Sequence, residues 1–241
     1  MSSARYVIRD AAKRALDLSI STLLLTLLLP VIVLCAVAIR LESPGPAFYR
    51  STRVGLRGRP FCMLKFRKMR DGVTGPPLTG AHDERFTWLG RALAASKLDE
   101  IPQLWNVLKG DMSLVGPRPE DPIFVAANRD AFEPILRIRP GITGLSQLAF
   151  AHESEILDHA APEERIESYL GQLLPQKIGL DTLYATSRSF AMDVRILCWT
   201  AFVVLLGGEV AVNRRSGALH RRLRPPVQRQ LVGVKEKGTT W

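Results

Sequence analysis

Two adjacent acidic residues, Asp99 and Glu100, are the clearest candidates for chemistry because they stand at the predicted start of a helix. A helix N-terminus stabilises negative charge through its free backbone N–H groups and its dipole. Taken alone, the pair is better explained as an ordinary helix cap and first-turn acid. The basic residues Arg91 and Lys97 precede it and an apolar helix face follows, and this setting favours a reactive carboxylate.

A stiff turn follows in the sequence, where Pro117 and Pro119 flank Arg118. Each proline fixes its own φ angle, so the guanidinium between them is carried by a rigid segment. A rigidly held Arg suits bidentate recognition of phosphate. A surface turn with a solvated Arg is the commoner outcome for such a tripeptide, and both interpretations stay open here.

A second group of cations lies upstream, where Lys65, Arg67, Lys68 and Arg70 are interleaved with apolar residues. On a strand, Lys65 and Arg67 share one face, opposite Phe66. The pyrophosphate of a nucleotide sugar needs such cations, or Mg²⁺, to offset its charge. A strand that faces solvent or lipid headgroups explains the cluster equally well.

An apolar run over residues 18–39 carries no formal charge and matches the roughly 20 residues needed to cross a bilayer core. Basic residues flank both ends, and such residues mark cytoplasmic flanks. Pro30 inside the run predicts a kink. A re-entrant helix and a bent spanning helix explain these features equally well. Asp17 is spaced to pair with Lys13 or Arg14 at the headgroup level.

The composition indicates a folded chain with an anionic partner. Of the 241 residues, 46% are hydrophobic, and 33 Lys and Arg against 23 Asp and Glu give a formal net charge of +10. This hydrophobic fraction argues against wholesale disorder. The basic balance favours nucleic acid, phospholipid headgroups or a phosphorylated substrate. Three scattered cysteines without zinc spacing indicate reduced thiols and a cytoplasmic setting.

The elements that position these residues are predicted within residues 41–207. Residues 48–70 have the pattern of a strand, a turn and a second strand around two glycines. Helical spacing recurs downstream, over residues 82–109, 128–139, 162–173 and 176–206. The absence of βαβ alternation disfavours a Rossmann-type fold. The predicted fold class is therefore α+β, mostly helical.

The chain divides into four predicted segments. Residues 1–12 form an N-terminal segment and residues 13–40 the membrane helix. Residues 41–207 form the domain that carries the candidate site, and residues 208–241 a basic, flexible tail. The apolar stretch 196–206 is too short to span a bilayer, which leaves a core helix or an interfacial helix.

The segment KLDEIPQLWNVLKGDMSLVGPRPE, at 97–120, closely resembles the bacterial sugar transferases, also called monotopic phosphoglycosyl transferases. Further segments match in the family's order: KRALDL at 13–18, ESPGPAFYRSTRVGLRGRPFCMLKFRKM at 42–69, RPGITGLSQ at 139–147 and LDTLYATSRSFAMDVRIL at 180–197. An ordered series of matches is far more specific than a single motif. The resemblance extends over roughly residues 13–206.

The resemblance implies a monotopic membrane protein with one re-entrant, Pro-kinked membrane helix and a small catalytic domain. That domain would lie on the cytoplasmic face of the bacterial inner membrane, with its interfacial helices at the bilayer surface. The resemblance further implies that Asp99 is the nucleophile and a ligand of Mg²⁺, with Glu100 as its partner in a catalytic dyad. It implies that Arg118 binds phosphate, and Lys65 and Asp193 match positions that are functionally relevant in the family.

The sequence departs from the family's pattern next to the nucleophile. Relatives often carry an Arg five residues before it, where this chain has Ala94, and Lys97 stands where a small polar residue is usual. Lys97 or Arg91 is a candidate source of the missing charge. The predicted residues for substrate phosphate and nucleotide are therefore Arg118, Lys65, Arg91, Lys97, Pro117, Pro119 and Asp193.

The predicted reaction moves a sugar-1-phosphate from a UDP-sugar to polyprenyl (undecaprenyl) phosphate through a covalent aspartyl intermediate, and it releases UMP. It would be the first membrane step of glycoconjugate or exopolysaccharide synthesis. The predicted partners are the UDP-sugar, the polyprenyl phosphate and membrane phospholipids, without nucleic acid, and a homodimer is compatible with the sequence. The alternatives are a non-enzymatic, membrane-bound basic scaffold and a glycosyltransferase that releases UDP. The sugar, the polyprenol length and the downstream polymer are left open.

Overall fold

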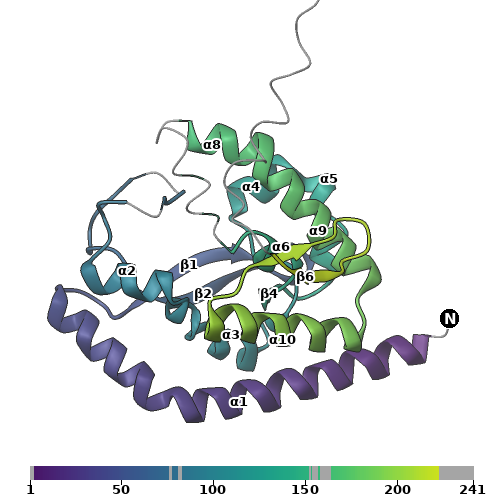
Figure 1. Ribbon diagram of the computed structural model, residues 1–241, viewed down its shortest axis with the longest axis horizontal. Helices are drawn as coiled ribbons and strands as arrows, with labels where there is room; N and C mark the ends of the chain where they lie inside the picture. Colours follow the sequence, from purple (N-terminus) through teal and green to yellow (C-terminus); the bar gives the residue numbers. More distant parts are fainter. Residues whose placement is uncertain are drawn as a thin grey trace, which may run out of the picture.

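A long helix, α1 (Ser3–Glu42), runs along one side of the molecule, and the other helices and the short strands are stacked against it (Figure 1). The computed structural model describes residues 3–75, 78–80, 83–151, 153, 157 and 164–222. Helix and strand are mixed and helix predominates, which confirms the predicted α+β class.

The other helices are mostly short and are joined by tight turns. In chain order they are α2 (Trp88–Ala95), α3 (Gln103–Lys109), α4 (Pro122–Ala127), α5 (Arg129–Phe132), α6 (Leu145–Ala149), α8 (Arg165–Ser168), α9 (Leu174–Ser187) and α10 (Phe190–Leu206). The predicted single helix over 176–206 is wrong, because the chain turns at Arg188. Ser189 then caps α10, its hydroxyl accepting from the backbone N–H of Met192.

Many apolar side chains of α1 are exposed and do not pack against the rest of the protein. Within the described residues, α1 is the one helix that is long and apolar enough to cross a membrane, over Arg9–Glu42. Its exposed large residues include Leu23, Leu27, Leu34 and Leu41. An exposed apolar surface of this length indicates association with a membrane. The helix is continuous through Pro30, and its axis changes direction partway along (Figure 1).

Asp17 joins α1 to the core of the molecule. Its carboxylate is buried and accepts hydrogen bonds from the Ser113 hydroxyl at 2.7 Å and the Leu114 backbone N–H at 3.1 Å. The expected pairing of Asp17 with Lys13 or Arg14 at the headgroup level is therefore wrong. The backbone of the neighbouring strand offers donors that a lipid headgroup does not, and a buried carboxylate requires such donors.

The two basic residues beside Asp17 instead reach other elements. Arg14 donates to the carbonyls of Val107 and Leu108 at 2.7 and 3.1 Å, at the C-terminal end of α3. Cations near a helix C-terminus satisfy its free carbonyls and complement its dipole. Lys13 forms an ion pair at 3.0 Å with Asp193 of α10. The polar contacts of Lys13, Arg14 and Asp17 thus fix the first half of α1 against the rest of the molecule.

Two strands, β1 (Phe48–Val54) and β2 (Pro60–Phe66), form the predicted antiparallel hairpin, with Val54 opposite Pro60 at the turn. Arg57 and Gly58 in that turn have φ angles of 58° and 74°. A glycine adopts this left-handed conformation without strain, which explains why a glycine-containing turn ends the strand.

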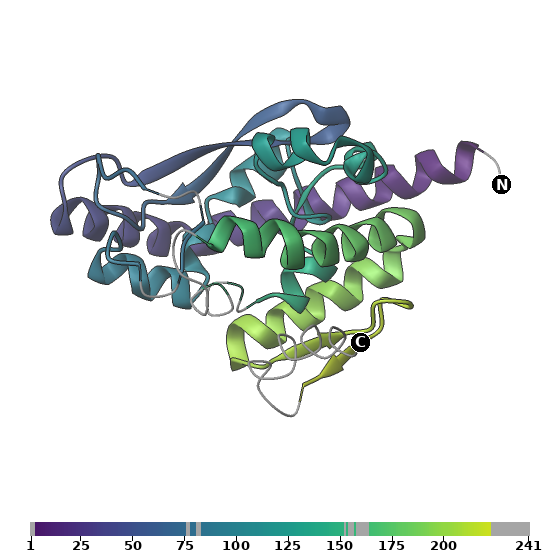
Figure 2. The same ribbon diagram turned by 90° about the horizontal axis from the view of Figure 1, so that it is seen from above.

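Two further strand pairs complete the sheet structure. β3 (Ser113–Val115) pairs in parallel with β4 (Gly141–Thr143), inside the core. β5 (Val210–Val212) pairs antiparallel with β6 (Leu219–Arg221). Figure 2 shows this last hairpin at the edge of the molecule opposite β1 and β2. The predicted tail from residue 208 is therefore wrong for this hairpin, because Val210 and Leu219 are buried against the core.

Candidate active site

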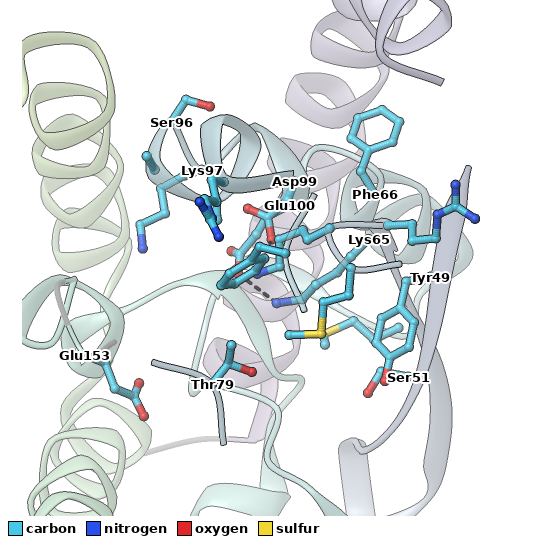
Figure 3. A pocket seen from close by; sticks show the side chains of 18 of the residues that line it. Tyr49, Ser51, Lys65, Phe66, Thr79, Ser96, Lys97, Asp99, Glu100 and Glu153 are labelled. Carbon is cyan, nitrogen blue, oxygen red and sulfur yellow. Dashed lines mark hydrogen bonds and ion pairs between the residues drawn. The ribbon is translucent and has the colours of Figure 1, made fainter. Parts of the chain in front are cut away.

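A large cleft of about 1780 Å³ lies between the β1–β2 hairpin, α6, α10 and the second half of α1. Its walls include apolar residues of α1, among them Ile32 and Val33, and the predicted acidic pair Asp99 and Glu100. Figure 3 shows the acidic pair between residues of the hairpin on one side and Glu153 on the other. One cleft therefore presents both charged groups and the apolar surface of the membrane helix.

Asp99 lies on a short 3-10 helix, η2 (Leu98–Glu100), between α2 and α3. Lys97, just before it, has a φ angle of 60°, and this left-handed residue reverses the chain after α2. Pro102 lacks a backbone donor, so the regular helix begins only at Gln103. Asp99 is only 2% exposed, and its Oδ2 lies 3.0 Å from the Nζ atom of Lys68.

Glu100 is held by two other cations. Its Oε1 lies 2.9 Å from Lys65 Nζ and 3.8 Å from an Arg118 guanidinium nitrogen, and Figure 3 draws the contact with Lys65. Burial alone would raise the pKa of the Glu100 carboxyl, but the attraction of Lys65 and Arg118 prevails and lowers that pKa to about 2. Burial, and the neighbouring charges of Arg118 and Lys68, lower the pKa of Lys65. With a pKa of about 2, the Glu100 carboxylate is ionised at neutral pH.

The turn that carries Arg118 is tightly packed against its neighbours. A Cβ added at Gly141 would lie 2.0 Å from the backbone nitrogen of Gly116, so only glycine lets these two segments approach so closely. The Pro117 carbonyl accepts from the Gly141 N–H at 2.8 Å. The backbone N–H of Arg118 donates to Asp181 at 3.3 Å. Backbone contacts thus fix the turn, and the guanidinium points into the cleft with Pro119 beside it.

A buried polar network lies behind Arg118, and the sequence interpretation missed it. Lys177 is 3% exposed and lies 2.9 Å from Glu120 and 3.3 Å from Glu153, and it donates to the Tyr169 hydroxyl at 2.8 Å. Burial would lower the pKa of the Lys177 ammonium, but Glu120 and Glu153 raise it. Glu120 follows Arg118 closely in the chain, so this network fixes the end of the turn. A lone Lys inside an apolar helical pattern gives no sequence signal for such a network.

The predicted site residues separate into two groups. Asp99, Glu100, Lys65, Arg118, Pro119, Arg91 and Lys97 all line the cleft. Lys97 donates to the carbonyl of Ala151 at 2.9 Å, and within the described residues neither it nor Arg91 contacts Asp99. Pro117 does not line this cleft; its carbonyl faces the Gly141 segment.

The structure does not bring Asp193 to this cleft. Asp193 is buried, pairs with Lys13 at 3.0 Å and accepts from the Tyr184 hydroxyl at 2.5 Å. A carboxylate repels phosphate, and these partners already satisfy the charge. Asp193 joins α10 to α1 through these contacts, and its part in substrate binding stays a prediction.

The acidic pair also bears on metal binding. Within the part of the chain that the structure describes, no group of three or more His, Cys, Asp or Glu residues is close enough to hold a metal ion by itself. Mg²⁺ is often held by one or two carboxylates together with substrate phosphates and water. Asp99 and Glu100 supply that number of carboxylates in a cleft with phosphate-binding cations. The donor set therefore fits Mg²⁺ bound together with a phosphorylated substrate.

The acidic pair, the surrounding cations and the exposed apolar helix together have the character of a membrane-associated enzyme. The family model described as bacterial sugar transferase matches residues 8–207. The chain belongs to this family of transferases.

Curated relatives of this chain carry names that specify related reactions. A relative from Caulobacter vibrioides, named UDP-glucose:undecaprenyl-phosphate glucose-1-phosphate transferase, is 40% identical over 196 residues, which cover 79% of this chain and 68% of the relative. An Escherichia coli protein of the same name is 36% identical over 79% of this chain, but only 39% of its own length is covered. An Aeromonas hydrophila protein named UDP-N-acetylgalactosamine-undecaprenyl-phosphate N-acetylgalactosaminephosphotransferase is 34% identical over 81% of this chain and 44% of its own length.

Proposed function

We propose that this protein transfers a sugar-1-phosphate from a UDP-sugar to undecaprenyl phosphate through a covalent intermediate on Asp99. An Asp99 carboxylate oxygen attacks the sugar-bearing phosphorus, the bond from that phosphorus to the bridging oxygen breaks, and UMP leaves with the electron pair. The lipid phosphate then attacks the same phosphorus and displaces Asp99. The products are UMP and a polyprenyl diphosphate-linked sugar.

The observation that carries this proposal is the buried, ion-paired Asp99 in a cleft that also contains Lys65 and Arg118. A nucleophile must face the substrate with a free electron pair, and Asp99 lines the cleft with one of its oxygens paired to Lys68. Lys65 and Arg118 also offset the charge that develops on the transferred phosphoryl group. Glu100 keeps both cations aimed at the cleft when no substrate is bound.

The membrane helix supports the choice of a lipid acceptor. Ile32 and Val33 of α1 line the same cleft as Asp99. An acceptor confined to the bilayer therefore meets the nucleophile at a raised effective concentration. We further propose that α1 is re-entrant, bends at Pro30, and places the cleft on the cytoplasmic face of the bacterial inner membrane.

Asp99 and Glu100 are the residues that would hold Mg²⁺ in this proposal. Bound there, the ion would offset negative charge on the pyrophosphate of the donor. The names of the relatives include both glucose-1-phosphate and N-acetylgalactosamine transfer. The sugar therefore has to be found by comparing UDP-sugars in the same UMP assay.

The experiment is UMP release by the full chain in vesicles that contain undecaprenyl phosphate, with a panel of UDP-sugars. We expect Asp99→Asn to lower the rate by about 1000-fold or more, since the nucleophile is lost. The matched control is Asp130→Asn, which removes an exposed carboxylate from α5. Without the lipid phosphate, wild-type protein should gain the mass of one sugar phosphate at position 99.

Three results would contradict the proposal. Wild-type UMP release by Asp99→Asn would exclude this nucleophile. Release of UDP would indicate transfer of the sugar without its phosphate. Vesicle binding without turnover of any UDP-sugar would favour the membrane-bound scaffold.

A further inference from the structure

Asp99 has a cation of its own, different from the two that hold Glu100. Lys68 Nζ lies 3.0 Å from Asp99 Oδ2, whereas Lys65 and Arg118 both contact Glu100. The Asp99 side chain is only 3% exposed, and an isolated carboxylate buried this deeply costs several kcal/mol. Lys68 is therefore the contact that compensates the charge of Asp99.

The backbone of Lys68 is fixed by the N-terminus of α2. Its carbonyl accepts from the Thr87 backbone N–H at 3.0 Å and from the Thr87 hydroxyl at 3.4 Å. A Cβ added at Gly90 would lie 1.9 Å from the Lys68 carbonyl oxygen, so α2 packs directly on this peptide unit. The Lys68 ammonium also lies 5.7 Å from the centre of the Phe86 ring, within cation–π range. Lys68 is thus held in place at both its backbone and its side chain.

Ala94 of α2 lines the same cleft as Lys68 and Asp99 and presents only a methyl group. Lys97 also lines this cleft, but it donates to the Ala151 carbonyl. Among the cations of the described residues, Lys68 is the one that forms an ion pair with Asp99, from just beyond the end of β2.

We infer that Lys68 is a further catalytic residue, whose ammonium contacts the reacting carboxylate of Asp99 and holds it ready for attack. The inference rests on the proposed function, since it assigns a partner to the proposed nucleophile. In this role Lys68 acts through its charge and takes no part in proton transfer. The ammonium orients the carboxylate before attack, and afterwards it lies beside the acyl phosphate formed between Asp99 and the sugar phosphate.

The test compares Lys68→Met with Lys68→Arg and with the double variant Lys68→Met/Ala94→Arg, in the UMP assay. We expect Lys68→Met to lower kcat by about 100-fold, with the KM for the UDP-sugar changed by less than about three-fold. Lys68→Arg should keep most of kcat because the charge remains. The double variant should recover at least about ten-fold of the loss, since it returns a cation to the same cleft. Lys109→Met is the matched control, because Lys109 pairs with Asp111 on an exposed part of α3.

A structural role for Lys68 would give a different pattern, with a lower melting temperature, an unchanged kcat per folded molecule and no recovery in the double variant. That pattern, or a Lys68→Met variant that raises only KM, would overturn the inference. If Lys68→Met fails to fold, Lys68→Gln repeats the comparison with a polar side chain. Loss of turnover in Asp99→Asn together with wild-type kcat in Lys68→Met would reject Lys68 and leave the proposed function intact. Full turnover in Asp99→Asn would reject the proposed function itself.

Discussion

The two adjacent carboxylates of the site differ in their partners, although they are neighbours in the chain. Glu100 is bound by Lys65 and Arg118, and its pKa of about 2 keeps it ionised across the physiological range. Asp99 is bound by Lys68 alone among the cations that the structure pairs with it in its described part. In the proposed reaction, a diphosphate that enters the cleft would compete with Glu100 for its cations and leave Asp99 as the carboxylate that faces the phosphorus. The division of labour between nucleophile and partner therefore follows from which cation reaches which oxygen.

Another buried carboxylate, Asp181, leads us to predict how stability changes with pH. Burial raises its pKa to about 7 in the folded protein from an ordinary 3.8, and one of its oxygens has no hydrogen-bond partner among the described residues. Between these two values the folded state binds the proton more tightly than the unfolded state. The free energy of unfolding from this group is therefore fully present below about pH 4 and falls as pH rises to about 7, by at most about 1.4 kcal/mol per pH unit.

Asp181→Asn removes this titration, so we expect a smaller loss of stability between pH 4 and pH 7 than in the wild type. Denaturant unfolding of both proteins at several pH values in the same detergent measures the difference. Other groups titrate equally in the two proteins and cancel. Parallel stability curves would contradict the assignment.

At the residue scale, the sequence names most of the charged residues of the site but not their pairing. Asp99, Glu100, Lys65 and Arg118 are all found from local motifs, because rigid turns and acidic helix starts leave a local signal. The pairs that hold them join segments far apart in the chain, and no local pattern reports such a distance. For the same reason the sequence does not single out Lys68, the residue that pairs with Asp99, whereas Lys97 and Arg91 line the cleft without an ion pair to Asp99 among the described residues.

At the scale of elements, local pattern predicts the β1–β2 hairpin well because its strands alternate and its turn contains glycine. It fails where tertiary contacts decide. Apolar residues at helical spacing on both sides of Arg188 hide the break between α9 and α10. The basic composition after residue 208 hides the β5–β6 hairpin. Buried Val210 and Leu219 stabilise that hairpin by packing, which a charge count does not register.

The attachment of α1 gives a prediction at this scale. Asp17→Ala removes the acceptor of the Ser113 hydroxyl and the Leu114 backbone N–H, and leaves two buried donors without a partner. We expect this to lower the free energy of unfolding by about 1–3 kcal/mol, measured by denaturation in detergent. Asp10→Ala is the control, since Asp10 lies half exposed on the same helix. Equal stability of the two variants would show that Asp17 does not anchor α1.

At the scale of the whole molecule, α1, with its exposed apolar side, also lines the cleft, and this arrangement supports the proposal that the chemistry takes place at the membrane surface. The sequence predicts a membrane helix over this apolar run, since the length of the run and its lack of charge are local properties. It does not distinguish a re-entrant from a spanning helix, because both have the same composition. The helix is continuous through Pro30, and a continuous helix is compatible with either topology.

Cysteine labelling answers that question. A re-entrant α1 puts residue 3 and residue 46 on the same side of the membrane, so Ser3→Cys and Pro46→Cys should both resist an impermeant maleimide in intact cells and both react after permeabilisation. Pro46 is exposed, whereas a side chain at Gly45 would collide with Arg67. The native residues Cys35, Cys62 and Cys198 are replaced first. Labelling of only one site from outside would show that the helix spans the bilayer.

The segment that carries Lys65 and Lys68, at the end of β2, is also bound to the end of α1. Buried Arg67, between Lys65 and Lys68, donates to the carbonyls of Pro44, Ser43 and Ile39 at 2.6, 2.7 and 3.3 Å, where α1 ends. The end of α1 also packs through Ile39 against Phe66, next to Lys65. A change in the tilt of α1 would therefore displace the segment that carries Lys65 and Lys68, and we expect bilayer thickness to alter the rate of the proposed reaction.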